Sequence, residues 1–252
     1  MPALLAIPAG LILGSFATVV AHRLPRGEPF VAGRSRFTAR GQTIAGWNGL
    51  PLLSRVLLRG RCRHCGGRIS PRYPLTEIAM AALFTGTVVI LGTGDWGSLA
   101  LGLALCGLLV IVTLTDLERR LIPNKVLLAG ALAAFALGAV SDPASVAARA
   151  IAAAGAGGLL LLVALAHPGA MGMGDVKLAA VMGLYLLSAV ALALVIGFAA
   201  GTLVGLALIA REGAAARTRA VPFGPFLALG GIVALWWGNE LLDWYLATSF
   251  AG

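Results

Sequence analysis

The chain of 252 residues is 59% hydrophobic and only 12% charged, and it carries a net charge of +9 at pH 7. A soluble globular protein has about 25% charged residues, and long apolar stretches exclude a disordered or collagen-like chain. The short alternating strands of a membrane barrel are also not visible. The composition therefore predicts an all-α polytopic membrane protein.

Hydropathy predicts about eight transmembrane helices. The first has no basic residue before it and is followed by basic residues, which predicts an uncleaved anchor with its N-terminus outside. The eight predicted spans are residues 2–21, 75–92, 97–115, 125–140, 145–166, 172–187, 189–210 and 223–246.

A strongly basic loop follows the first span. Between His22 and Tyr73 the chain has eleven arginines and a single acidic residue, Glu28. Basic loops of membrane proteins stay in the cytoplasm, and this one would also attract anionic lipid headgroups. It lacks the interleaved aromatic residues of a nucleic-acid surface, so we expect no nucleic-acid partner. The predicted division is a first helix at 1–21, a cytoplasmic loop module at 22–74 and a multi-span core at 75–252.

The charges of the short links between spans predict which helix ends share a membrane face. Links 117–125 and 211–219 carry three basic residues each, whereas links 92–97 and 141–144 carry Asp95 and Asp142 and no basic residue. With the basic links in the cytoplasm, Asp116 at the end of the third span and Asp175 at the start of the sixth lie at the cytoplasmic face.

Asp116 and Asp175 are therefore candidate partners. A carboxylate close to the bilayer interior is costly and usually faces a polar cavity. Two carboxyls held close together share a proton and titrate as a pair, so one can activate water while the other protonates a carbonyl oxygen. The alternative is that each aspartate only caps a helix. That alternative is weaker for Asp116, because an acid near a helix C-terminus opposes the helix dipole.

Four residues around this pair are candidates for supporting roles. Gly172 and Gly174 precede Asp175 and would let the backbone approach a substrate closely. Lys177 would either influence Asp175 or extend to the lipid headgroups. Glu77, at the start of the second span, would either contact substrate or lie beside a helix cap formed by Thr76.

Cys62 and Cys65 form a pair with metal-ligand spacing in the basic loop. A structural zinc site needs four ligands, and the loop region adds only His22 and His64. Zinc and two free cytosolic thiols both remain open. A third cysteine, Cys106, lies within a predicted span, so the three do not form an extracellular disulfide framework.

Motifs along most of the chain resemble those of the type IV prepilin peptidases, a family of membrane aspartyl proteases with a GxGD motif. The matching residues are Gly14-Ser15-Phe16, Arg23-Leu24-Pro25, Leu52-Leu53-Ser54, Leu58-Arg59-Gly60-Arg61-Cys62, Ile69-Ser70-Pro71-Arg72-Tyr73-Pro74, Glu77, Asp116, Ile122-Pro123-Asn124, Gly172-Met173-Gly174-Asp175-Val176-Lys177-Leu178 and Pro222-Phe223-Gly224-Pro225.

The resemblance implies that Asp116 and Asp175 are the catalytic aspartates. It implies cleavage of the basic leader of prepilins and pseudopilins at the cytoplasmic face of a prokaryotic inner membrane. It also implies methylation of the new N-terminus with S-adenosylmethionine, and zinc in the loop of many members. The oligomeric state is not predicted.

The chain departs from the family pattern in the loop. Phe37 and Arg40 stand where the family often has a first cysteine pair. This departure leaves a protease without methyltransferase activity as an alternative to the bifunctional enzyme. A separate alternative is a small transporter whose aspartates bind protons or cations, although both acids lie near one face and no repeat is apparent.

Overall fold

The structure is a computed structural model that describes residues 2–28, 70–167, 171–213 and 221–250. Within these ranges every regular element is helical, as the composition predicts. The chain divides into two compact units, Met1–Thr93 and Gly94–Gly252, and each is described by itself.

The first unit is a pair of helices. Helix α1 spans Pro2–Arg23 and is followed by the short 3-10 helix η1, Leu24–Arg26, while α3 spans Arg72–Leu91. The pair packs through glycines of α1. A Cβ atom at Gly10 would collide with the backbone of Ala81, and one at Gly14 would lie 2.8 Å from Cα of Glu77. Small residues allow this close approach, which replaces the hydrophobic drive between helices in lipid.

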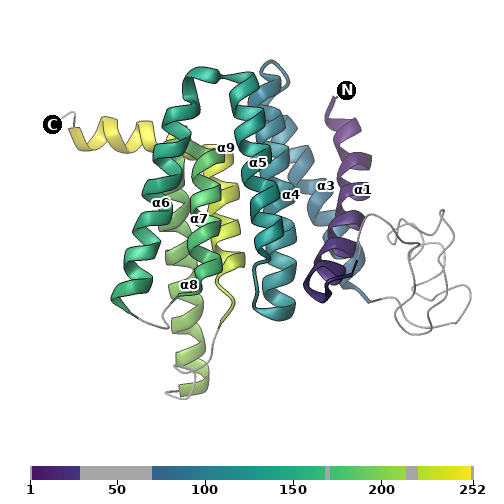
Figure 1. The fold of residues 1–252 in the computed structure, drawn as a ribbon, viewed down its shortest axis with the longest axis vertical. Helices are drawn as coiled ribbons and strands as arrows, with labels where there is room; N and C mark the ends of the chain where they lie inside the picture. Colours follow the sequence, from purple (N-terminus) through teal and green to yellow (C-terminus); the bar gives the residue numbers. More distant parts are fainter. Residues whose placement is uncertain (1, 29–69, 168–170, 214–220, 251–252) are drawn as a thin grey trace, which may run out of the picture. The chain divides into compact units, whose positions relative to one another are not determined.

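The second unit contains the remaining helices (Figure 1). They are α4 (Trp96–Arg119), α5 (Asn124–Ser141), η3 (Pro143–Ser145), α6 (Val146–Ala166), α7 (Met173–Leu186), η4 (Leu187–Ala189), α8 (Val190–Glu212) and α9 (Gly224–Phe250).

The predicted spans and the observed helices agree within a few residues at most ends. In the described part of the chain, seven helical stretches are long and apolar enough to cross a membrane. One of them, Met173–Glu212, contains both α7 and α8. The chain reverses between these two helices at η4, so the fold agrees with the predicted number of about eight.

Helix α7 is the centre of the second unit. It contacts α4, α5, α6, α8 and α9 (Figure 1). Close packing depends on glycine: a Cβ at Gly183 would lie 2.7 Å from backbone atoms of Ala152 and Ala153 in α6. At Gly231 of α9, a Cβ would meet Met182 of α7 and Leu109 of α4 at 2.9 and 3.0 Å.

Polar side chains add fixed points to this packing. The buried hydroxyl of Tyr185 in α7 donates a 2.8 Å hydrogen bond to the carbonyl of Gly130 in α5. Arg149 of α6 is also buried, and its Nη1 donates to the carbonyl of Leu184 at 2.8 Å. Its Nε donates to Oγ of Ser145 at 2.9 Å. Buried polar groups need such partners, because an unpaired group loses its hydration without compensation.

Both ends of α4 are well defined. The Asp95 carboxylate accepts a 2.9 Å hydrogen bond from the N–H of Gly97 and so caps the first turn. A side-chain hydrogen bond with Ser98 lowers the pKa of Asp95. At the other end, Arg120 has φ 53°, a left-handed conformation that ends the helix one turn after Asp116.

Replacing Gly183 by alanine should destabilise the protein, because its Cβ would overlap the backbone of α6. Overpacking of this kind costs about 1–3 kcal/mol, so we expect a clear drop in melting temperature of the detergent-solubilised protein. The matched control is Gly155→Ala in α6, where a Cβ meets nothing within 4 Å. There alanine is favoured over glycine by about 0.5–1 kcal/mol. Equal melting temperatures for the two variants would contradict this packing.

Candidate active site

Asp116 lies in the last turn of α4 and is almost completely buried, with 6% of its surface exposed. Its Oδ2 accepts a 2.8 Å hydrogen bond from the backbone N–H of Gly224, 108 residues later in the chain. Hydrogen bonds to a charged acceptor are about twice as strong as neutral ones. The first residue of α9 therefore holds the carboxyl group of Asp116 in one orientation.

Only a residue without a side chain fits at position 224. A Cβ at Gly224 would lie 2.9 Å from Oδ2 of Asp116 and 3.3 Å from its Cγ. The backbone can reach the carboxylate only because no side chain intervenes. Pro222 and Pro225 flank this glycine and restrict the backbone on both sides of the contact.

Asp175 is the third residue of α7, and Gly172 is the residue that precedes the helix. The Asp175 carboxylate lies against the backbone of Gly172, where a Cβ would come within 3.2 Å of Oδ2. An acid at this position is stabilised by the unpaired N–H groups of the helix start. The cap interpretation is thus partly right for Asp175. Its carboxyl group is also close enough to that of Asp116 for the two charges to interact.

The turn between α4 and α5 packs against the start of α7. Ile122 covers Gly174, where a Cβ would lie 3.1 Å from Cβ of Ile122. Two residues later, Oδ1 of Asn124 accepts a 2.9 Å hydrogen bond from Nζ of Lys177. This turn therefore joins the segment after Asp116 to the segment around Asp175, and Lys177 is held by Asn124 in an exposed position.

Glu77 lies in the other unit and is fully buried in α3, with 0% exposure. The predicted cap at Thr76 is wrong: α3 begins at Arg72, and the Thr76 hydroxyl donates a 2.9 Å hydrogen bond to the carbonyl of Arg72 inside the helix. Helix α3 starts earlier than expected because Pro71 precedes it and Pro74 fits its first turn. A contact of Glu77 with substrate stays a prediction.

Cys62 and Cys65 lie outside the described residues. Among the residues that the structure describes, no group of three or more His, Cys, Asp or Glu side chains is arranged to hold a metal ion. Cys106 is buried in α4. Zinc in the loop stays a prediction.

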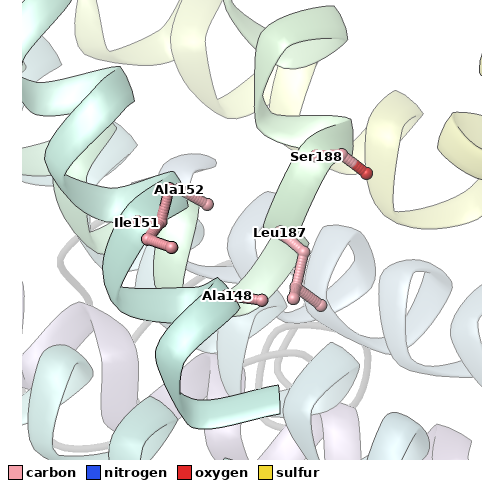
Figure 2. Close-up of a pocket in the computed structure, with 5 residues that line it drawn as sticks. All are labelled: Ala148, Ile151, Ala152, Leu187 and Ser188. Carbon is pink, nitrogen blue, oxygen red and sulfur yellow. The ribbon is translucent and has the colours of Figure 1, made fainter.

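A pocket of about 350 Å³ opens elsewhere in the second unit (Figure 2). It is lined by Ala148, Ile151, Ala152, Leu187 and Ser188. Leu187 and Ser188 belong to η4, at the opposite end of α7 from Asp175. The lining has one hydroxyl and no charged group, so this pocket is separate from the pair of aspartates.

Comparison with known proteins assigns the chain to a family. Residues 9–91 match the model of the bacterial peptidase A24 N-terminal domain, and residues 103–210 match that of the type IV leader peptidase family. The chain belongs to the type IV leader peptidase family. It is therefore an enzyme of a protease family and a multi-pass membrane protein.

Curated relatives within this family align with nearly the whole chain. Prepilin leader peptidase/N-methyltransferase of Aeromonas hydrophila is 34% identical, over 95% of this chain and 92% of the relative. The protein of the same name from Bacillus subtilis (strain 168) is 34% identical, over 94% of this chain and 95% of the relative. The Burkholderia pseudomallei (strain K96243) protein is 33% identical, over 93% and 85%. No solved structure matches the chain.

Sequence reasoning missed the contacts that orient the predicted site. Gly224, Ile122 and Asn124 occur in segments that match the leader peptidase pattern, yet no chemistry pointed to them individually. The one local signal was a glycine between two prolines, Pro222-Phe223-Gly224-Pro225. Such a rigid turn next to a membrane span is a place where backbone groups are fixed and available to a neighbour.

Replacing Gly224 by alanine should reduce peptidase activity by about 100-fold, since displacing a reacting group by about 1 Å has an effect of this size. The added Cβ would push the Asp116 carboxylate away while the N–H donor remains. Gly205→Ala in α8 is the matched control, because a Cβ there meets nothing within 4 Å. Activity is measured on purified protein with equal amounts of folded enzyme. Full activity of Gly224→Ala would show that this contact does not position Asp116.

Proposed function

We propose that the chain is a prepilin peptidase in which Asp116 and Asp175 form the catalytic pair. The observation that supports the proposal is that these two acids, from helices far apart in the sequence, lie at the same end of the second unit, close enough for their charges to interact. The names of the curated relatives support prepilins as the substrate class.

The pair supplies the chemistry of peptide hydrolysis without a metal. One carboxylate takes a proton from water as the water oxygen attacks the scissile carbonyl carbon, and the other, protonated, carboxyl donates its proton to the carbonyl oxygen. The C–N bond then breaks, and the leaving nitrogen takes up a proton. Two carboxyls in contact share one proton between them, which keeps one as base and one as acid.

Both carboxyl groups have neighbours that favour the charged form. The Gly224 N–H donates to Asp116, and Arg120 lies close enough to interact with its charge. The backbone of Gly172 and the start of α7 stabilise a negative charge on Asp175. Either carboxyl group can therefore act as the base while the other, protonated, acts as the acid.

The glycines of the Asp175 segment suit an approaching peptide. Gly172 is exposed, and Gly174 lies beneath Ile122. We propose that the substrate backbone passes along the exposed side of this segment, next to Asp175. Lys177, held by Asn124, lies at the edge of the same segment and is available to a polar group of the substrate.

The end of the bundle that carries the aspartates faces the cytoplasm in this proposal. Exposed Arg119 and Arg120 come three and four residues after Asp116, and Lys125 lies at the start of α5 at the same end. Basic residues accumulate on the cytoplasmic side. A prepilin has a basic leader before an apolar helix, so its cleavage site would reach the enzyme at this face of the inner membrane.

The length of α7 suggests the depth of the reaction. This helix has 14 residues, and at about 1.5 Å per residue it is about 21 Å long. The hydrocarbon core of a bilayer is about 30 Å thick. The helix is therefore shorter than the core, and with its η4 end at the outer boundary Asp175 would lie inside the membrane, short of the inner boundary.

Methylation of the new N-terminus is a separate part of the proposal, supported by the names of the relatives. The pocket beside η4 does not fit S-adenosylmethionine. This cofactor carries a carboxylate, an ammonium and a sulfonium group, whereas the lining of the pocket beside η4 offers only the Ser188 hydroxyl. We derive no step through the cofactor. A peptidase without methyl transfer is the second candidate, favoured by Phe37 and Arg40 in place of a cysteine pair.

The transporter interpretation has no comparable support. The chain belongs to a protease family, and both acids lie at one end of the bundle instead of near its middle, where transporters bind their ions.

Asp116→Asn and Asp175→Asn should each lower prepilin cleavage by about 100- to 10,000-fold, because each removes one half of a general acid–base pair. Asparagine keeps the size and the hydrogen-bonding capacity of the side chain, so folding should be preserved. Cleavage of a purified prepilin in liposomes is followed by mass spectrometry. Asp142→Asn, at an exposed link outside the pair, is the matched control. Substantial cleavage by either Asn variant would exclude the two-acid mechanism.

Product mass in the presence of S-adenosylmethionine decides between the bifunctional enzyme and the simple peptidase. We expect the cleaved product of the wild type to gain the mass of one methyl group. The comparison is the same reaction without the cofactor, which should give the unmethylated product at the same rate. A cleaved product that never gains the methyl group would establish the second candidate.

A further inference from the structure

The C-terminal part of α9 leaves the helical bundle. Up to Gly238, α9 packs against its neighbours, and a Cβ at Gly238 would lie 2.7 Å from Cβ of Ala189 in η4. After this point the side chains from Asn239 to Ser249 are exposed, apart from a half-buried Leu242. Figure 1 shows this last part of α9 running across the direction of the other helices of the unit.

The position of this part follows from two contacts of α9. Its first residue, Gly224, bonds to Asp116. Gly238 lies against η4, which follows the end of α7 opposite to Asp175. The exposed segment 239–249 therefore starts at the opposite end of the bundle from the two aspartates. We name it the distal α9 segment.

The distal α9 segment is amphipathic. At 3.6 residues per turn, its aromatic and leucine side chains fall on one broad face together with Trp237 just before it, and its amide and acidic side chains fall on the opposite face. The first face has Trp237, Leu241, Leu242, Trp244, Tyr245 and Leu246, and also Thr248 and Ser249; the second has Asn239, Glu240, Asp243 and Ala247. The Thr248 hydroxyl donates to the backbone carbonyls of Trp244 and Tyr245, so its hydrogen bonds are made within the helix.

The apolar face is exposed, as are large apolar side chains on the other helices. Trp244, Tyr245 and Leu246 are 66%, 57% and 50% exposed. What distinguishes this face is its exposed tryptophan and tyrosine, which are typical of the boundary between acyl chains and headgroups because they combine an apolar ring with a polar group.

We propose that the distal α9 segment lies flat in the interfacial layer of the bilayer, at the face opposite to Asp116 and Asp175. Its aromatic face enters the acyl-chain boundary, and Glu240 and Asp243 face water. The direction of the segment across the bundle matches an interfacial helix instead of a continued span.

The charge of the segment defines which lipids it fits. It carries Glu240 and Asp243 and no basic residue. Interfacial helices that depend on anionic lipids are rich in lysine and arginine on their polar face. The aromatic side chains are therefore the anchor, and binding should be the same on zwitterionic and on partly anionic membranes.

A pair of spin labels tests the proposal directly. Tyr245→Cys and Asp243→Cys place labels on opposite faces of the same turn, in a full-length protein whose three native cysteines are replaced by serine. In phosphatidylcholine liposomes, collision with oxygen relative to a water-soluble nickel chelate should be several-fold higher at 245 than at 243. Adding anionic phosphatidylglycerol should leave this ratio unchanged.

Three outcomes would overturn the proposal. Equal and high oxygen access at both positions would mean that the segment crosses the bilayer core. High nickel access at both would mean that it projects into water. A label at 245 shielded from both reagents would mean that protein covers the face, and dipolar broadening between labels would then identify a second copy of the chain.

A second measurement needs no cysteine replacement. Tyr245→Glu places a charge on the aromatic face, and Ala247→Glu places one on the polar face, where the side chain is already exposed. In liposomes the first should lower the melting temperature, and the second should leave it unchanged. An equal effect of both would also overturn the proposal.

Discussion

The hydrogen bond from Gly224 to Asp116 is the contact on which the arrangement of the second unit depends most directly. It joins the end of α4 to the start of α9 at a carboxyl group that is almost fully buried. A buried carboxyl without a partner would be strongly unfavourable among apolar helices. The contact therefore stabilises the fold and orients Asp116 at the same time, and the chain needs glycine at position 224 for both reasons.

Close packing of α7 determines where Asp175 lies. Gly183 permits contact with the backbone of α6, Tyr185 bonds to α5, and Ile122 covers Gly174 at the other end of the helix. These contacts come from different neighbours and act along the whole length of α7. A short helix held in this way cannot slide along its axis, so the depth of Asp175 relative to Asp116 is set by packing and not by the loop that precedes it.

The two ends of α9 have different surroundings. At its start, the backbone N–H of Gly224 donates a hydrogen bond to the Asp116 carboxylate. At its far end, aromatic side chains are exposed. If the far end is held in the interfacial layer, α9 also relates the depth of Gly224 to the membrane boundary. The depth of the proposed site would then be set from both faces of the bilayer.

The sequence by itself determined the helical class, the approximate limits of the spans and the candidate pair Asp116 and Asp175, because hydropathy and basic residues follow the membrane directly. It also indicated that these two acids share a face. The sequence did not reveal the donor from Gly224, the cover that Ile122 forms over Gly174 or the bond between Lys177 and Asn124. The cap predicted at Thr76 is wrong for a local reason, because Pro71 precedes α3 and the helix begins at Arg72. Only the tertiary structure decided the contacts of Gly224, Ile122 and Lys177, since they depend on backbone groups and side chains that meet across more than fifty residues of chain, whereas hydropathy reports only the local environment of each helix.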